Sequence, residues 1–258
     1  MKAHLSHKIK SPLVMVVVSI LLIIFSLSTS TADLTDDLVG YWPLDEDASD
    51  AINNNDGKLV GGAKFVKDGT RGQVLSVDGA DGRVEIPDAE ELNFEPADSF
   101  SVALWLDIQK LPGHWAGVVT KGRDTPNWYG LWVMPESKWH FVGGQGGVNV
   151  RLDTGLAETG WLHVVCVYDA SAHTQTVYVD AEAVGEGKGV TIAASGAADL
   201  WFGGAKSVNE FLEARMDDVL LYRRILNEDE LKELASGVDV LAIKPQGKLA
   251  TTWAQLKR

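Results

Sequence analysis

Short segments in which apolar and polar residues alternate recur along this chain and constrain its fold more than any other feature. The clearest runs from Phe100 to Gln109, where every second residue is large and apolar. A period of two is typical of a β-strand with one buried face. Similar runs are separated by Asp-Gly, Asn-Asp-Gly and Gly-Gly turns, with no helical period between them. The pattern predicts an all-β antiparallel sandwich and argues against a parallel sheet with crossover helices. The other runs are 39–44, 73–77, 83–86, 117–121, 130–134, 139–142, 148–152, 161–168, 174–179, 200–203 and 214–222.

One helix is expected, close to the end of the chain. Asn227 can cap its N-terminus, and Glu230 stands three residues later as the reciprocal partner of a capping box. Leu226 and Leu231 form the hydrophobic staple of such a start. The helix is expected to run through Leu234 and to stop at Gly237, because glycine favours helix ends.

The first 32 residues have the three parts of a secretory signal. A basic start is followed by an apolar run from Leu13 to Leu27 and by small residues, with Ser30 and Ala32 at the cleavage positions. The alternative is a retained membrane anchor, but the apolar run is shorter than the ~20 residues that cross a bilayer. We therefore expect a signal peptide over 1–32, one domain over 33–237 and a C-terminal tail over 238–258. The protein is then secreted, periplasmic or held at the cell surface, and its mature chain does not span a membrane.

Charge and cysteine content exclude several classes of function. The net charge is −13, and it becomes −16 once the leader with its three lysines is removed. Such a chain is a poor partner for nucleic acid or for an anionic membrane surface. The single cysteine, Cys166, rules out an internal disulfide. It lies in the apolar run 161–168, so we expect an inert core thiol, the alternative being a nucleophile with a basic neighbour.

Several segments resemble, in order, the laminin G-like branch of the concanavalin A-like lectin/glucanase superfamily. The most specific is the closing segment Met216–Leu226 (MDDVLLYRRIL), which is followed by the capped helix. The resemblance covers roughly residues 38–237 and implies a jelly-roll sandwich of two antiparallel sheets. One departure is Asp180-Ala181, since the family usually has glycine after the aspartate. The other matching segments are 38–46 (LVGYWPLDE), 50–57, 73–79, 84–87, 99–106 (SFSVALWL) and 161–165 (WLHVV).

The sequence lacks the catalytic patterns of related hydrolases. Glycosidases need two carboxylates roughly 5–10 Å apart, and laminarinase-type enzymes of the superfamily place theirs on one strand as E-x-D-x-x-E. The nearest match, 228–233, lies on the expected helix, where acidic residues stabilise the N-terminus. We expect no catalytic residues, although an acid pair assembled from distant strands stays open.

A structural calcium ion is one expectation that the resemblance implies. Members of the superfamily often hold calcium with an acid from the first strand, turn carbonyls and an aspartate of the closing segment. The matching positions in this chain are Asp45 and Asp217, with Asp78 as a neighbour. Carboxylate and carbonyl oxygens suit calcium. The alternative is that Asp45 is a solvated strand end and Asp217 caps a turn.

Aromatic residues in one loop-rich stretch are the candidate ligand-binding residues. Trp115, Trp128, Tyr129 and Trp139 fall in or beside residues 111–147, which are rich in Gly, Pro and Asn. Loop residues carry function more often than core residues, and exposed aromatic rings together form a platform for sugars. The alternative is that these rings fill the space between the loops and the sheet.

We expect an exported, non-catalytic module that binds a polysaccharide or an extracellular glycoprotein, with calcium as a possible structural ion. A secreted polysaccharide hydrolase or lyase with a diverged site is the first alternative. The second is a cell-surface adhesion or assembly protein that docks through the tail 244–258.

Overall fold

The computed structural model describes residues 33–125, 128–145, 148–192, 195–206 and 208–241. All of them lie in one compact unit. The predicted signal peptide and residues 242–258 of the predicted tail lie outside the described residues. Within the described part of the chain, no helix has the length and apolar character needed to cross a membrane.

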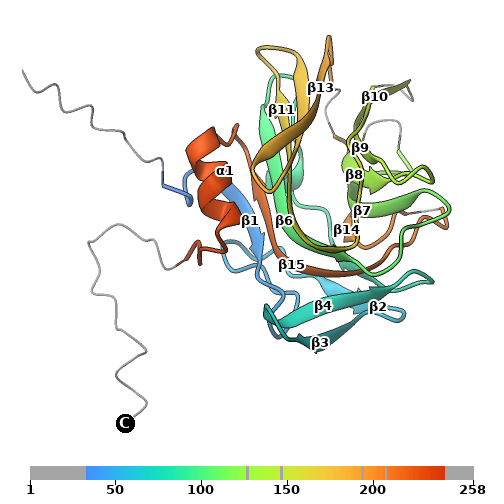
Figure 1. The fold of residues 1–258 in the computed structure, drawn as a ribbon. Coiled ribbons are helices and arrows are strands. Elements are labelled where there is room, and N and C mark those ends of the chain that lie inside the picture. The colour runs from blue at the N-terminus through green and yellow to red at the C-terminus, as the bar shows by residue number, and fades with distance from the viewer. Residues whose placement is uncertain (1–32, 126–127, 146–147, 193–194, 207, 242–258) are drawn as a thin grey trace, which may run out of the picture. The chain divides into compact units, whose positions relative to one another are not determined.

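The fold is a sandwich of two antiparallel sheets that enclose the main hydrophobic core (Figure 1). One sheet has eight strands in the order β13-β12-β11-β6-β15-β4-β3, with β1 also paired to β15. The other has seven, in the order β10-β9-β8-β7-β14-β5-β2. The jelly-roll sandwich predicted from the sequence is confirmed.

Fifteen strands, the 3-10 turn η1 and the helix α1 follow one another along the described chain. They are β1 (Leu38–Trp42), β2 (Lys58–Val60), β3 (Lys64–Asp68), β4 (Gly72–Asp78), β5 (Arg83–Ile86), η1 (Glu90–Leu92), β6 (Phe100–Ile108), β7 (Ala116–Lys121), β8 (Tyr129–Val133), β9 (Trp139–Gln145), β10 (Val148–Thr154), β11 (Gly160–Asp169), β12 (Thr174–Val179), β13 (Glu182–Lys188), β14 (Leu200–Phe202), β15 (Glu213–Tyr222) and α1 (Glu228–Ala235).

Strand β6 shows how the alternation builds the core. Phe100 and the apolar residues at every second position after it face the seven-stranded sheet. The Phe100 ring stacks on Phe94 with ring centroids 4.5 Å apart. Between these positions, Ala103 faces the opposite side of the sheet. Cys166 is fully buried on β11, and this burial raises the pKa of its thiol, as expected for an inert core residue.

Three strands do not show in the sequence pattern, namely β2, β3 and β13. Each lies at the edge of its sheet, with β3 and β13 at the two ends of one sheet and β2 at an end of the other. An edge strand has one neighbour and is more open to water, so its sequence is under weaker pressure to alternate. Their residues are accordingly mostly exposed or half-buried.

Helix α1 covers part of the outer face of the eight-stranded sheet. Asn227 and Glu230 form the predicted capping box. Leu231 and Leu234 pack with Ala103 and Val165 of the sheet in a second hydrophobic cluster. The helix ends at Ala235, and Gly237 has a positive φ of 76°. The outer face of this sheet is therefore partly occupied by the chain's own helix.

The hairpin between β12 and β13 contains the departure from the family pattern. Val179 pairs with Glu182, so Asp180 and Ala181 form a two-residue turn. Both have positive φ, 49° and 66°. A turn of this kind favours Gly at its second position, because a Cβ atom crowds the left-handed conformation.

We predict that Ala181→Gly stabilises the protein by about 0.5–1 kcal/mol, since the strain at this turn exceeds the small contact that its methyl group makes. Urea unfolding measures the change. Ala235→Gly, in helix α1, is the control and should lower the stability because glycine disfavours a helix. Equal destabilisation by both substitutions would contradict strain at the turn.

Candidate functional site

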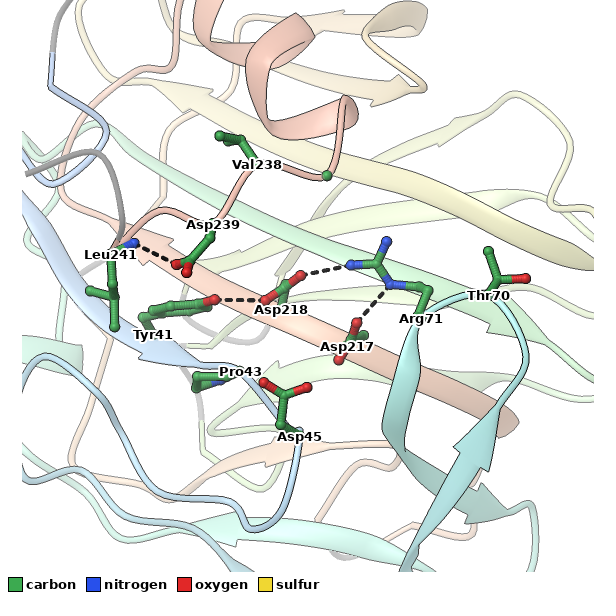
Figure 2. Close-up of a pocket in the computed structure, with 11 residues that line it drawn as sticks. Tyr41, Pro43, Asp45, Thr70, Arg71, Asp217, Asp218, Val238, Asp239 and Leu241 are labelled. Atoms are coloured by element: carbon green, nitrogen blue, oxygen red, sulfur yellow. Dashed lines mark hydrogen bonds and ion pairs between the residues drawn. The ribbon is translucent and has the colours of Figure 1, made fainter. Parts of the chain in front are cut away.

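A pocket of about 470 Å³ opens on the outer side of the eight-stranded sheet, and we call it the Asp217 pocket (Figure 2). Asp217 and Asp218 come from β15, and Tyr41 comes from β1. Arg71 lies in the turn between β3 and β4, and Asp45 follows β1. The pocket therefore gathers residues that are far apart in the sequence.

A break in strand pairing places the two adjacent aspartates at this pocket. One edge of β15 pairs with β4 up to Met216 and with β1 from Val219 onward. Asp217 and Asp218 lie at the change of partner, where the pairing with β6 also shifts register. Asp218 has a positive φ of 48°, and its N–H donates to the Pro43 carbonyl at 3.2 Å. Such a bulge re-aims side chains locally.

Arg71 bridges both carboxylates. Its Nε donates to Oδ2 of Asp217 at 2.6 Å, and its Nη2 donates to Oδ2 of Asp218 at 2.7 Å. The Tyr41 hydroxyl donates to the other oxygen of Asp218, also at 2.7 Å. Figure 2 shows these three contacts converging at the bulge. They tie β1, β15 and the β3–β4 turn together.

The rings of two tryptophans pack against the Arg71 guanidinium. Its Cζ lies 4.3 Å from the ring centroid of Trp105 and 5.5 Å from that of Trp161. Contacts of this kind attract a cation through the ring quadrupole. The side chain of Arg71 is only 14% exposed. The guanidinium is therefore held both by aromatic rings and by carboxylates.

The electrostatics of Asp217 are unusual. Burial and the neighbouring charge of Asp218 raise its pKa to about 7, and Arg71 offsets only part of this rise. Its side chain is 5% exposed, and its Oδ1 atom is buried without a hydrogen-bond partner. Partial burial and the Glu46 charge also raise the pKa of Asp45.

The three predicted metal ligands do not gather at one place. Asp45 and Asp217 line the same pocket, but Asp78 lies at the end of β4 and is not part of its lining. Oδ1 of Asp78 accepts hydrogen bonds from the backbone N–H groups of residues 80, 81 and 82. These bonds lower the pKa of Asp78. Asp78 thus organises its own turn.

The arrangement at Asp217 does not fit a calcium ion, because the Arg71 guanidinium already lies against both Asp217 and Asp218. Among the residues that the structure describes, no three His, Cys, Asp or Glu side chains are placed to hold a metal. Calcium binding by the chain stays a prediction.

The four predicted ligand-binding aromatics divide into two pairs. Tyr129 and Trp139 point into the core, with 1% and 0% of their surface exposed. The Tyr129 hydroxyl donates to the Leu92 carbonyl at 3.0 Å. Trp128, only 6% exposed, and the half-buried Trp115 pack with the buried Trp132 in a separate cluster. Ligand binding by the four residues stays a prediction, and burial favours a core role for Tyr129 and Trp139.

The second pair belongs to a group on the outer face of the seven-stranded sheet, which we call the Trp115 surface. It comprises Trp115, Arg123, Trp128, Trp132, His140, Asp153 and Glu210. The half-buried Trp115 ring meets His140 edge to face, with centroids 4.7 Å apart. His140 Nδ1 lies 2.6 Å from Oδ1 of Asp153.

Polar contacts continue across this surface. Nε1 of Trp132 donates to Glu210 at 2.8 Å, and Arg123 lies 3.6 Å from the other oxygen of Glu210. The Arg123 guanidinium also lies over the Trp128 ring. Arg123, Asp153 and Glu210 are all half-buried, as is Trp115, whereas Trp128, Trp132 and His140 are buried. Trp115 is therefore the ring of this group that is partly open to water.

Trp132 and His140 are not among the residues predicted from the sequence, although a signal for both was present. Successive residues of a strand point to opposite faces of the sheet. In β8 and β9, Tyr129 and Trp139 are on the same face as the apolar core residues. Trp132 and His140 are on the opposite, outer face.

Comparison with known families identifies the fold. A laminin G-type family model, described as concanavalin A-like lectin/glucanases superfamily, matches residues 78–232. The chain belongs to this superfamily. No curated protein sequence matches the chain significantly.

Solved structures agree with membership of the superfamily at the level of fold. The binding domain of Paraclostridial Mosquitocidal Protein 1 is 16% identical, with a TM-score of 0.66 over 79% of this chain and 53% of that one. Domain 4 of AbnA, an extracellular arabinanase from Geobacillus stearothermophilus, solved with arabinotriose, is 17% identical, with a TM-score of 0.62 over 77% and 98%. Trypanosoma rangeli sialidase, solved with the inhibitor DANA, is 20% identical, with a TM-score of 0.59 over 76% and 32%. The chain thus spans about half of the first structure and a third of the sialidase.

The raised pKa of Asp217 predicts a pH dependence of stability. Between about pH 4 and pH 7 the native state holds a proton at Asp217 that the unfolded chain releases. The free energy of unfolding therefore falls as the pH rises, by roughly 1–3 kcal/mol from this residue. Asp217→Asn should remove that part of the slope, measured by urea unfolding at several pH values.

His163 contributes with the opposite sign, because burial, and then the Arg71 charge, lower its pKa to about 4. The difference between the wild type and Asp217→Asn isolates Asp217. Parallel curves for the two proteins would show that Asp217 is ionised throughout this range.

Proposed function

We propose that this chain is an exported, non-catalytic module that binds a glycan through the Trp115 surface. The main observation in support is the edge-to-face contact of the Trp115 ring with His140. The carboxylates of Asp153 and Glu210 belong to the same group of side chains. Sugars present C–H faces that stack on aromatic rings and hydroxyl groups that need acceptors. A partly exposed aromatic ring beside a few placed polar groups is a common element of a ligand site.

The comparisons with solved structures support the proposal, but the proposal does not depend on them. Domain 4 of AbnA, a structure of similar fold, was solved in complex with arabinotriose. Because that domain is 17% identical to the chain, the identity of the sugar does not transfer. The predicted signal peptide supports export, where a polysaccharide or an extracellular glycoprotein is available as partner.

Truncation of the tryptophan tests the proposed surface. We predict that Trp115→Ala weakens glycan binding about tenfold, the equivalent of ~1.4 kcal/mol, because the stacking ring is lost. A glycan array identifies the ligand, and titration calorimetry with that ligand measures the change.

Trp161→Ala is the matched control, since Trp161 is also half-buried but lies on the other sheet. It should leave the affinity unchanged. Loss of binding in Trp161→Ala with full binding in Trp115→Ala would move the site to the eight-stranded sheet. Failure to bind any glycan at high protein concentration would contradict the proposal.

A glycoside hydrolase is the second candidate function, and one observation favours it. Asp217 has a pKa of about 7 and shares a pocket with Asp45. A glycosidase needs one protonated carboxyl group beside a second carboxylate. Against this function, Arg71 contacts the same carboxyl group at 2.6 Å and lowers its pKa.

Turnover separates the two functions. A hydrolase releases reducing ends from laminarin, agarose or carrageenan, and Asp217→Asn abolishes the release. We predict no release by the wild-type protein. Release that persists undiminished in Asp217→Asn would point to a contaminating enzyme, and release lost with Asp217→Asn would establish the hydrolase.

A further inference from the structure

The resemblance implies a cation at the position of Asp217, and the structure already contains one. Asp217 and Asp218 are adjacent and both approach the gap between β4 and β1, where β15 changes partner. Two ionised carboxylates this close repel each other unless a positive charge lies between them. A cation at this position therefore stabilises the bulge whenever both groups are ionised.

The guanidinium of Arg71 supplies this positive charge through two separate donors. Nε contacts Asp217 at 2.6 Å and Nη2 contacts Asp218 at 2.7 Å. Each contact is a charge-assisted hydrogen bond, and the planar guanidinium can serve two acceptors at once because its donors point in fixed directions. A calcium ion could reach the same oxygens only by displacing this group.

The backbone and the neighbouring rings pre-position Arg71. Oδ1 of Asp68 accepts hydrogen bonds from the backbone N–H groups of Thr70 at 2.7 Å and of Arg71 at 3.0 Å. These bonds fix the turn from which the side chain extends. Trp105 and Trp161 flank the guanidinium. Arg71 is thus held in place by its own turn and by the sheet, independently of Asp217 and Asp218.

We propose that Arg71 is a built-in cation that replaces a metal ion in this sandwich and joins β15 to β1 and to the β3–β4 turn. The native protein then needs no calcium for its stability. Removal of Arg71 leaves Asp217 and Asp218 facing the pocket without a counter-charge. Carboxylates freed in this way can turn toward a calcium ion, which prefers such oxygen ligands, so the variant should acquire a calcium response that the wild type lacks.

Thermal unfolding of the full chain in millimolar calcium and in chelator tests the proposal. The wild-type midpoint should be the same in both. Arg71→Met should unfold at a lower temperature in chelator and recover part of the loss in calcium, because an ion that binds only the native state stabilises it. Arg83→Met is the matched control, since Arg83 pairs with Glu85 at 2.7 Å, lies over the Trp201 ring and does not line the pocket. It should show no calcium response.

Two further variants keep the test decisive. Arg71→Lys keeps the positive charge and should stay insensitive to calcium even if Arg71→Met does not fold. Arg71→Met combined with Asp217→Asn should lose the calcium response of the single variant. A wild-type midpoint that rises with calcium would overturn the proposal, as would an Arg71→Met protein that folds and ignores calcium. A calcium response that survives Asp217→Asn would place the ion elsewhere and also overturn it.

Discussion

The pairing of β15 is the constraint on which the rest of the structure depends. This strand lies inside the eight-stranded sheet, and its residues contribute to both the main core and the cluster beneath α1. One of its edges pairs with β6, while the other is shared between β4 and β1. Because this edge changes partner, its hydrogen-bonded pairing is interrupted, and Asp217 and Asp218 lie at the interruption. The charge cluster of the Asp217 pocket is thus a consequence of topology.

The two outer faces of the sandwich are used differently. On the eight-stranded sheet, α1 covers one part, and Arg71 with its tryptophans and carboxylates occupies another. These contacts hold strands together, so we assign this face to stability. On the seven-stranded sheet, aromatic and charged side chains of the Trp115 surface lie over the strands instead. Recognition on that face would leave the strand pairing untouched.

Much of the fold follows from the sequence because it depends on local patterns, whereas the Arg71 contacts depend on register. The alternation from Phe100 onward places one set of residues in the core, and the capping box at Asn227 fixes the start of α1. Arg71 and Asp217, by contrast, are 146 residues apart, and they meet because of the register between β4 and β15. No local pattern reports that register, and the segment 216–222 contains nothing that distinguishes an aspartate that binds a metal from one that binds arginine.

The central claim is that a metal-independent sandwich presents a glycan-binding surface. The most direct measurement is a glycan array probed with the purified protein in chelator and, separately, in calcium. We predict that the same glycans bind with the same strength under both conditions. Binding that appears only with calcium would contradict the claim.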